Sequence, residues 1–297
     1  MSNFKHYIAS FRLRTLPLSL SGIILGSLLA SSVGYFNLTT FILAITTTLC
    51  LQILSNLANE LGDLQKGTDN EQRLGPIRSI QSGAITIKAF KQTIGVFILL
   101  SICSGVALIF LAFDALFSQD GIILLALGGI SIVAALKYTI GKGAYGYHGL
   151  GDLFVFLFFG LLSVSGSWFL MTHSLDFSIF LPAASIGLLA TGVLNLNNMR
   201  DIENDHLCGK HTLPVLIGIS KAKIYHTGLI IGAFLTMIIY MYLQGIQMVH
   251  FSFLLTLPLF IIHIQKVRNA QGRTLDAQLK ILSIYTFIFA LISGFSL

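Results

Sequence analysis

Long apolar segments separated by short polar connections are the feature that most constrains how this chain folds. Nine such segments occur, and each is near the ~20 residues that a helix needs to cross a bilayer. They lie at roughly 15–33, 38–62, 86–113, 121–140, 150–173, 177–200, 221–244, 247–264 and 276–297. Backbone polar groups inside a bilayer must be paired within the protein, and these runs are too long and continuous for barrel strands. Helices are therefore the only plausible spans.

The composition supports a polytopic membrane protein. Of the 297 residues, 55% are hydrophobic and only 10% are charged, whereas a soluble domain usually carries about 25% charged residues. We therefore expect an all-α bundle of about nine transmembrane helices, forming a single membrane domain over residues 1–297. The three cysteines form no pattern typical of a disulfide framework.

The basic residues predict how the bundle is oriented. All 18 lie in the N-terminal arm and in four connections, at 63–91, 137–142, 200–223 and 266–280. The intervening connections contain none; they lie at 34–37, 114–120, 174–176 and 244–247. By the positive-inside rule, the N-terminus and the basic connections are expected in the cytoplasm, and nine crossings place the C-terminus outside. The net charge of +6 is thus a topology signal and does not indicate nucleic-acid binding.

The second apolar segment ends in an acidic stretch, NLANELGDLQKGTD, which begins at Asn56. Asn59 and Asp63 are four residues apart and therefore share one face of a helix. Asp69 follows after Gly67, a residue expected to end that helix. A charged cluster beside an apolar core is costly, so this stretch is predicted to be functional.

The sixth apolar segment ends in a similar stretch, NLNNMRDIENDHLCGK, which begins at Asn195. Asn197, Asp201 and Asp205 form an unbroken i, i+4, i+8 row. The Asn-x3-Asp pattern thus recurs four segments after its first occurrence, which predicts two pseudo-repeated halves. If the two acidic faces converge, they make an oxygen-rich site at the membrane surface.

The residue types in the two motifs indicate a hard cation and a diphosphate. Carboxylate and amide oxygens suit Mg²⁺, which prefers one or two carboxylates together with phosphate oxygens. The expected metal ligands are Asp63, Asp69, Asp201 and Asp205. The candidates to hold phosphate are Lys66, Arg73, Arg78, Lys137, Lys142 and Lys210. A diphosphate at the mouth of an apolar bundle implies a lipid diphosphate, whose tail lies among the helices.

Four stretches of this sequence together resemble the UbiA-type superfamily of intramembrane aromatic prenyltransferases. They span nearly the whole chain: RLRTLPLSLSGIILG (12–26), NLANELGDLQKGTDNEQRLGPIRSIQSGAIT (56–86), AYGYHGLGDLFVFLFFG (144–160) and NNMRDIENDHLCGKHTLPVLIG (197–218). The second and fourth are specific in combination. Position 67 is Gly where the superfamily usually has its third acid, and Asp69 lies two residues further on. This spacing is similar to the menaquinone branch, the 1,4-dihydroxy-2-naphthoate polyprenyltransferases, although Glu60 stands where relatives usually have Asp.

The resemblance implies a Mg²⁺-dependent prenyl transfer at the cytoplasmic side of a bacterial inner membrane. An allylic polyprenyl diphosphate loses diphosphate and forms a carbocation. The ring of 1,4-dihydroxy-2-naphthoate attacks this cation and loses its carboxylate as CO₂, giving demethylmenaquinol. Asp63 and Asp201 are the acids with expected catalytic roles, and the substrate-binding set also includes Asn59, Asn197 and Arg14.

The stretch KYTIGKGAYGYHGLGD (137–152) is basic and aromatic and is expected on the same membrane face as the acidic motifs. Aromatic faces stabilise cations, so Tyr138 is predicted to face the allyl cation. Lys142 is predicted to help hold the diphosphate or the acceptor carboxylate. Water would trap the cation, and the apolar bundle is expected to exclude it.

Two alternatives remain open from the sequence. The acceptor is a different aromatic compound in the first: 4-hydroxybenzoate, homogentisate or haem. The second is a secondary transporter with an internal repeat, which predicts charged residues or broken helices at the midplane. The acids instead cluster at one face. No obligate protein partner is evident in the sequence.

Overall fold

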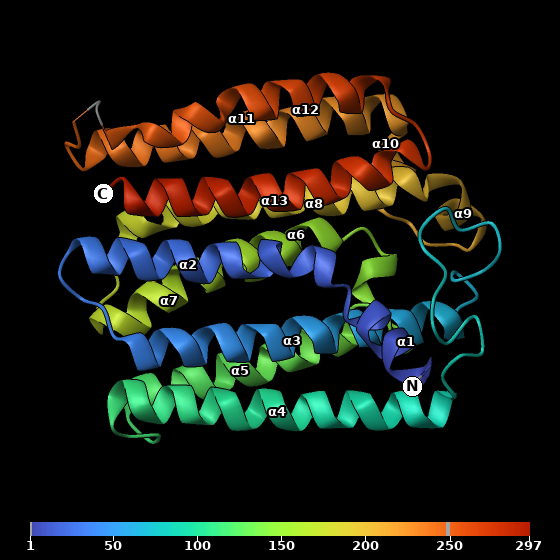
Figure 1. Cartoon of the computed structure of the whole chain (residues 1–297), viewed down its shortest axis with the longest axis horizontal. Coiled ribbons are helices and arrows are strands. Elements are labelled where there is room, and N and C mark those ends of the chain that lie inside the picture. Colours follow the sequence, from blue (N-terminus) through green and yellow to red (C-terminus); the bar gives the residue numbers. More distant parts are fainter. Residues whose placement is uncertain (1, 248–249) are drawn as a thin grey trace.

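Helices form from the predicted apolar segments in the computed structural model, which describes residues 2–247 and 250–297. The long helices are α2 (Leu16–Ser32), α3 (Leu38–Gln65), α4 (Ile87–Phe113), α5 (Gln119–Lys137), α8 (Phe180–Arg200), α11 (Ile219–Leu243) and α13 (Thr274–Phe295). One further span is built from α6 (Gly151–Val155), the π-helix η3 (Phe156–Leu162) and α7 (Ser163–Thr172). These spans run side by side along one bundle (Figure 1). The all-α prediction is confirmed for the described residues, which include no strand.

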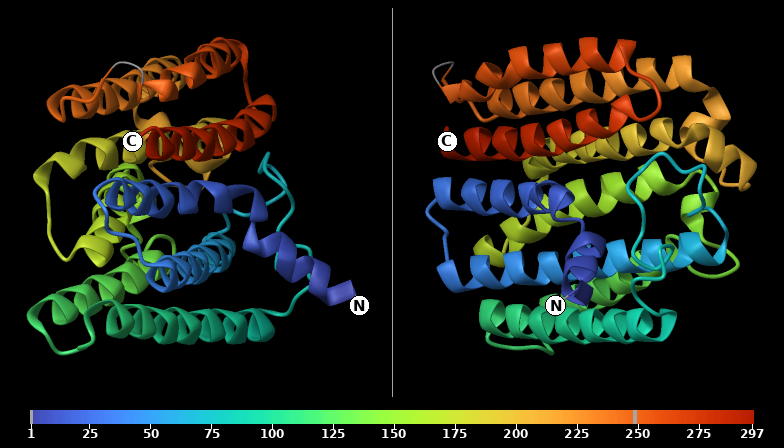
Figure 2. Two further views of the ribbon diagram at one scale, coloured as in Figure 1. Left: turned by 60° about the vertical axis from the view of Figure 1, so that its left-hand side comes forward. Right: turned by 45° about the vertical axis from the view of Figure 1, so that its right-hand side comes forward.

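Shorter helices form the ends and connections of the bundle. They are α1 (Ser2–Phe11), η1 (Leu13–Thr15), η2 (Tyr145–Tyr147), η4 (Phe177–Ile179), α9 (Ile202–Leu207), α10 (Leu213–Ile217), η6 (Ser252–Thr256) and α12 (Leu257–Asn269). Figure 2 shows α1 projecting from the bundle near the N-terminus. The connection after α3 lies beside α9 in both figures, so the two predicted acidic regions meet at one end of the molecule.

The described residues contain eight helices that are long and apolar enough to cross a membrane. The predicted segment 247–264 differs from these, because it forms η6 and then α12, which has only 13 residues. Residues 248–249 of that segment lie outside the described residues. Helix α12 packs along the bundle beside α11 and α13, and the two chain ends lie at opposite ends of the bundle (Figure 1). Nine crossings and the orientation of the termini stay predictions, as does the duplication of the two halves.

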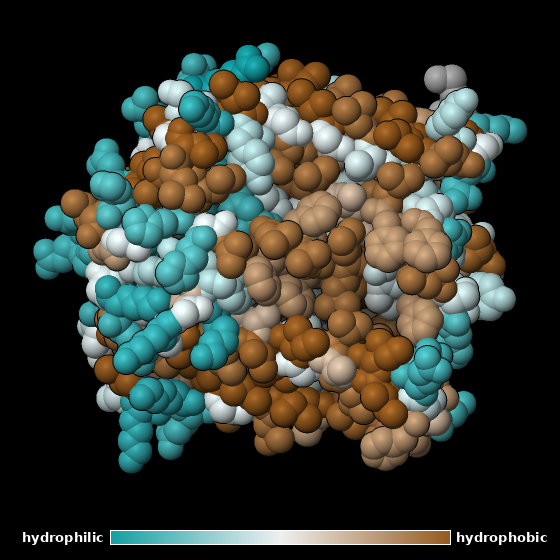
Figure 3. Space-filling model, turned by 180° about the vertical axis from the view of Figure 1, so that it is seen from behind, coloured by the Kyte–Doolittle hydropathy of each residue, from teal (hydrophilic) through white to brown (hydrophobic). Residues whose placement is uncertain are grey.

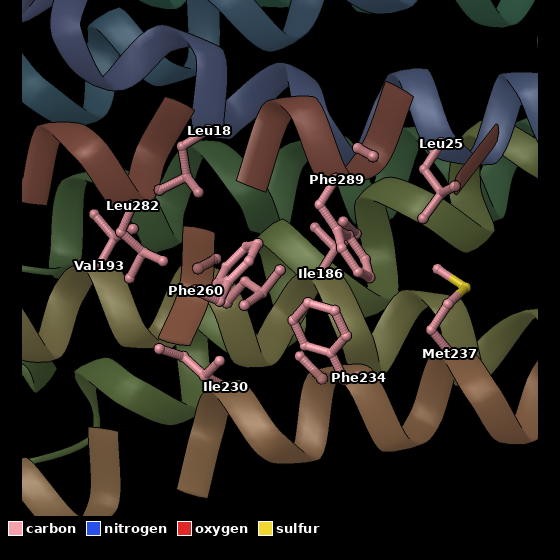
Figure 4. Close-up of a cluster of buried hydrophobic side chains, with 14 of the residues drawn as sticks. Leu18, Leu25, Ile186, Val193, Ile230, Phe234, Met237, Phe260, Leu282 and Phe289 are labelled. Carbon is pink, nitrogen blue, oxygen red and sulfur yellow. The ribbon is translucent and has the colours of Figure 1, made fainter. Parts of the chain in front are cut away.

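The larger apolar core lies between α2, α7, α8, α11, α12 and α13. In Figure 4, Phe234, Phe260 and Phe289 point toward one another from α11, α12 and α13, next to Ile186 of α8. The rings of Phe234 and Phe260 meet edge to face with their centroids 5.1 Å apart, a favoured arrangement for aromatic pairs. This core joins the C-terminal helices to α8 and thus fixes the helix that carries the second acidic motif.

On the face shown in Figure 3, polar side chains are most numerous at one end, fewer lie at the other end, and the middle is broadly apolar. Many large apolar side chains are exposed, among them Leu99, Ile130 and Ile231 near the middles of α4, α5 and α11. Such a band would be unfavourable in water but suits lipid. The surface therefore agrees with a multi-pass membrane protein.

Candidate functional site

A cavity of about 380 Å³ begins at the polar end of the bundle and continues between α2, α3, α5 and α7. Along α3 its lining runs from Ala44 to Asp63, a distance of roughly 28 Å at ~1.5 Å per residue. That length is close to the thickness of the hydrocarbon core of a bilayer. The far part of the lining is apolar and includes Leu108, Leu124 and Leu170.

Most of the residues predicted for the site line this cavity. They are Asn59, Asp63, Arg73, Arg78, Tyr138, Asn197, Asp201, Asp205 and Lys210. They come from the end of α3, the connection that follows it, the end of α5, and the region from α8 to the end of α9. The fold therefore brings both acidic motifs to the polar end of a single cavity.

Direct contacts join the two acidic regions. The Lys210 Nζ atom lies 3.5 Å from Asp63 Oδ1 and 3.9 Å from Asp205 Oδ1. The two carboxylates raise the pKa of Lys210 although its burial opposes this change. In addition, the Asn204 side-chain amide donates a hydrogen bond of 2.8 Å to the backbone carbonyl of Thr68. One lysine is thus shared between the motifs, and it remains a cation.

The first acidic motif ends in an irregular connection. Helix α3 ends at Gln65, and Gly67 has a φ of +72°, as expected for a residue that ends a helix. Asp69 is fully buried between Arg73, whose Nε is 3.0 Å away, and Arg78, whose Nε is 3.6 Å away. Burial raises the pKa of Asp69. Asp69 itself is not part of the described cavity lining. Its two arginine partners, Arg73 and Arg78, do line the cavity.

The second acidic motif remains helical but bends. Helix α8 ends at Arg200 and α9 begins at Ile202, so the predicted row does not lie on one continuous helix. Asp201 is the N-cap of α9, and its carbonyl accepts the first hydrogen bond of that helix from the Asp205 backbone N–H at 2.8 Å. Burial opposes ionisation of Asp201, but hydrogen bonds from Arg200 to both carboxylate oxygens lower its pKa. Burial raises the pKa of Asp205 to about 7.

Four predicted basic residues are not part of the described cavity lining: Arg14, Lys66, Lys137 and Lys142. Arg14 forms an ion pair of 2.8 Å with Asp276. The Lys66 ammonium lies 3.7 Å above the ring of Tyr147, a cation–π contact. The side chains of Lys137 and Lys142 are exposed.

Two residues at the site were not selected from the sequence. Arg12 lines the cavity, and its Nε and Nη2 atoms are buried without a hydrogen-bond partner. Its φ of 53° is uncommon for a residue other than glycine. Tyr147 donates a hydrogen bond of 2.8 Å to Asp63 and lies 2.6 Å from the Thr68 hydroxyl. Both residues lie in stretches that carry the family resemblance, Arg12 in 12–26 and Tyr147 in 144–160, but neither belongs to a spaced acidic motif.

A row of aromatic rings also lines the cavity. Tyr138 meets Tyr145 edge to face at 5.2 Å, and Tyr145 stacks on Phe154 at 3.9 Å between centroids. Phe154 is followed by Phe158 at 6.1 Å. Burial raises the pKa of Tyr138, so its phenol stays neutral. The row extends from the polar end into the apolar part of the cavity.

The η3 segment places part of this row on the cavity wall. π-Helical turns are rare and are frequently found at functional sites. Here a Cβ atom on Gly160 would lie only 2.5 Å from the Cα of Gly187, so η3 and α8 approach very closely. On the other side of η3, Phe158 and Phe159 face the cavity.

The carboxylates fit a divalent cation that is bound together with phosphate. Asp63, Asp201 and Asp205 present oxygens to the same cavity, and both oxygens of buried Asp69 accept no well-directed hydrogen bond. No group of three or more His, Cys, Asp or Glu side chains in the described part of the chain is arranged to hold a metal ion by itself. This arrangement suits Mg²⁺, which takes few protein carboxylates and completes its shell with phosphate oxygens and water.

Comparison with known proteins gives the class of this protein. The model of the UbiA prenyltransferase family matches residues 19–290. The chain belongs to the UbiA prenyltransferase family. Membership in this family argues against the transporter alternative.

Individual relatives and solved structures are similar to this chain over most of its length. The chain is 43% identical to the 1,4-dihydroxy-2-naphthoate octaprenyltransferase of Escherichia coli (strain K12) over 88% of this chain and 84% of the relative. It is also 43% identical to the Haemophilus influenzae protein of the same name, over 92% and 90% of the two chains. The fold resembles the apo structure of a UbiA homologue from Aeropyrum pernix K1, with a TM-score of 0.69, 18% identity and coverage of 96% and 97%. It also resembles an Archaeoglobus fulgidus homologue bound to GPP and Mg²⁺, with a TM-score of 0.63, 15% identity and coverage of 96% and 98%.

Proposed function

We propose that this protein transfers the polyprenyl group of an allylic polyprenyl diphosphate to 1,4-dihydroxy-2-naphthoate. The products are demethylmenaquinol, diphosphate and CO₂. The observation that carries the proposal is a single cavity with an acidic and basic polar end and a deep apolar end. Such a cavity suits a molecule with a diphosphate head and a long hydrocarbon tail. The choice of acceptor follows the two relatives that are 43% identical.

The diphosphate head is assigned to the polar end, where Arg73, Arg78 and Lys210 line the cavity. Each guanidinium group can donate two parallel hydrogen bonds to the oxygens of a phosphate. The Lys210 ammonium supplies a point charge between the two motifs. The prenyl tail is assigned to the apolar part, past Phe158 and toward Leu124. Burial of the tail excludes water from the reacting carbon, which protects the cation from hydrolysis.

Asp63, Asp201 and Asp205 are the proposed Mg²⁺ ligands that face the cavity. Asp69 is the fourth proposed ligand; it does not line the described cavity and forms an ion pair with Arg73. A Mg²⁺ ion held by these residues would supply positive charge to the diphosphate leaving group. The A. fulgidus homologue contains Mg²⁺ together with GPP, which supports the use of a divalent cation with a prenyl diphosphate. The chain's own cations then stabilise the departing diphosphate.

Tyr138 is the proposed aromatic face for the allyl cation, because it lines the cavity at the junction of its polar and apolar parts. Its neutral phenol offers a π face without a competing negative charge. Arg12 is the cation whose Nε and Nη2 lack a hydrogen-bond partner, and we assign it to the acceptor carboxylate or the diphosphate. Holding the naphthoate ring beside C1 would supply part of the rate enhancement by orientation.

The decisive test is an acceptor assay in membranes that contain the protein. A polyprenyl diphosphate would be supplied with 1,4-dihydroxy-2-naphthoate, 4-hydroxybenzoate, homogentisate or haem in parallel. We expect prenylation, with release of CO₂, only with the naphthoate. Transfer to another acceptor in preference to the naphthoate would overturn the assignment.

We further propose that the site faces the cytoplasm of a bacterial inner membrane, because the connection after α3, the region of α9 and α10, and the connection from α12 to α13, all of which carry basic residues, lie at one end of the bundle (Figure 1). A single-cysteine labelling scan with a membrane-impermeant reagent tests this. Cysteines at 118 or 175 should react from outside, whereas a cysteine at 70 should react only after the membrane is opened. Labelling of position 70 from outside would contradict the orientation.

A further inference from the structure

Asp276, in the first turn of α13, connects two arginines that are far apart in the sequence. Its Oδ2 atom accepts a hydrogen bond of 2.8 Å from Arg14 Nη1, and its Oδ1 atom accepts one of 2.5 Å from Arg200 Nη1. Asp276 does not line the described cavity. Each of its carboxylate oxygens is thus used by a different arginine behind the site.

Arg200 transmits this contact to the second acidic motif. It is among the largest fully buried side chains, at 1% exposure. Its Nε and Nη2 atoms donate to the two oxygens of Asp201 at 3.1 and 2.5 Å, and Nη2 also donates to Asn197 Oδ1 at 2.9 Å. A buried guanidinium held by two carboxylates has little freedom to rotate, so it fixes Asp201 and Asn197 as they face the cavity.

Arg14 transmits the contact to the N-terminal arm. It lies in η1, only two residues after Arg12. Arg12 adopts a left-handed backbone conformation that turns the chain between α1 and η1. Anchoring of Arg14 on Asp276 holds this turn against α13, and with it the Arg12 guanidinium on the cavity wall.

We propose that Asp276 is a positioning residue for the prenyl transfer proposed above. It fixes Arg200 and Arg14, and through them it aligns Asp201 for the divalent cation and Arg12 for an anionic group of a substrate. The inference rests on the proposed function for the identity of the substrates, but the ion-pair network itself does not. Residues that orient the ligands of a metal typically change metal affinity or activity when they are replaced.

A purely structural role predicts a different outcome. An acidic residue in the first turn of a helix is stabilising through the helix dipole, so loss of Asp276 would lower thermal stability without a specific effect on metal binding. Asp120 provides a matched control, because it is also an acidic residue in the first turn of a helix, α5. No ion pair of Asp120 occurs among the described residues.

The experiment compares Asp276→Asn and Asp120→Asn in the full-length purified protein. Binding of Mn²⁺, used in place of Mg²⁺, is measured by electron paramagnetic resonance, and the melting temperature is measured in the same detergent. We expect Asp276→Asn to weaken Mn²⁺ binding and to lower kcat/KM for the polyprenyl diphosphate roughly 10- to 100-fold. Asp120→Asn should lower the melting temperature through the lost helix-dipole interaction, but it should keep the parental Mn²⁺ affinity and kcat/KM. Parental Mn²⁺ affinity in a folded Asp276→Asn variant would overturn the proposal.

A double-mutant cycle tests whether Asp276 acts on Arg12 through Arg14. Arg14→Met alone should lower kcat/KM, whereas the same change in the Asp276→Asn background should add little, because the anchor is already lost. Fully additive losses would show that Arg14 acts independently of Asp276 and would contradict the network.

The role of Asp276 can still be measured if the Asp276→Asn variant does not fold or if the parent protein transfers no prenyl group. If Asp276→Asn does not fold, Arg200→Lys replaces it, since lysine keeps the charge but cannot bridge Asp201 and Asp276 with a rigid fork. The same loss of Mn²⁺ affinity is then expected, and parental affinity would overturn the proposal. If the parent protein transfers no prenyl group to any acceptor, the proposed function fails, while the Mn²⁺ titration still decides the role of Asp276.

Discussion

The two acidic regions read alike in sequence but are built differently. The first begins in the last turns of α3 and continues as an irregular connection up to α4, whereas the second runs from the end of α8 past Asp201 into α9. Asp63 is held by residues distant in sequence, Tyr147 and Lys210. Asp201 is held mainly by its own neighbour, Arg200. The same Asn-x3-Asp spacing therefore produces two carboxylates with different partners.

The two carboxylates of the second region also differ in how readily they ionise. The Arg200 fork lowers the pKa of Asp201 in spite of its burial, so this acid is ionised near neutral pH. One turn later, burial raises the pKa of Asp205 to about 7. The spacing of acids thus fixes where the carboxylates are, and their packing partners fix how readily they ionise.

Removal of the leading acid of each motif tests whether the two regions are equivalent in catalysis. Asp63→Ala and Asp201→Ala should each lower turnover at least ~10²-fold, on the scale of lost transition-state charge stabilisation. Asp114→Asn, at the opposite end of the bundle, is the control and should behave as the parent. Turnover is measured in membranes with and without EDTA. Near-normal rates in both alanine variants, or full activity in EDTA, would contradict the metal site.

Replacement of the shared lysine should affect both regions together. Lys210→Met leaves Asp63 and Asp205 without their common cation and should lower kcat/KM for the polyprenyl diphosphate about tenfold or more. The matched change Lys221→Met removes an exposed charge and should have little effect. If the two variants give equal values of kcat/KM, Lys210 does not act on the diphosphate.

The aromatic wall belongs to neither acidic region and should show a distinct kinetic signature. Tyr138→Leu should lower kcat about tenfold, on the scale of one cation–π contact, with little change in KM for either substrate. Tyr138→Phe keeps the π face and should retain much of the activity. A Tyr138→Leu variant with the parental kcat would exclude a cation-stabilising role.

The smallest expected effect concerns the hydroxyl group that supports only the first region. Tyr147→Phe removes the hydrogen bond to Asp63 and should lower kcat/KM about two- to tenfold, the scale of one hydrogen bond. Tyr225→Phe, which removes a hydroxyl contact of 3.3 Å to Asp152, is the control. The comparison predicts that the effect of Tyr147→Phe disappears in an Asp63→Asn background but persists in an Asp201→Asn background. Persistence in both would mean that Tyr147 acts elsewhere.

The sequence predicted several residues of the cavity wall because they lay in a pattern with a local cause. Asn59, Asp63, Asn197 and Asp201 follow apolar segments at helical spacing, and the structure places all four on the cavity wall. Arg14 was predicted, but Arg12, two residues earlier, is the arginine that lines the cavity. Sequence spacing alone could not show which of the two faces the cavity. Their roles depend on a left-handed turn at Arg12 and on Asp276, which lies 262 residues after Arg14.

The sequence by itself determined that this chain is an all-α membrane bundle with two acidic motifs at one face. The reason is that the cost of exposing charge or unpaired backbone groups to lipid is local and can be read segment by segment. The tertiary structure decided which cations meet which acids, that Asp69 lies behind the wall, and that Asp276 joins Arg14 to Arg200. Those choices depend on contacts between distant helices, because a buried charge is stabilised by whichever opposite charge the packing brings within a few ångströms.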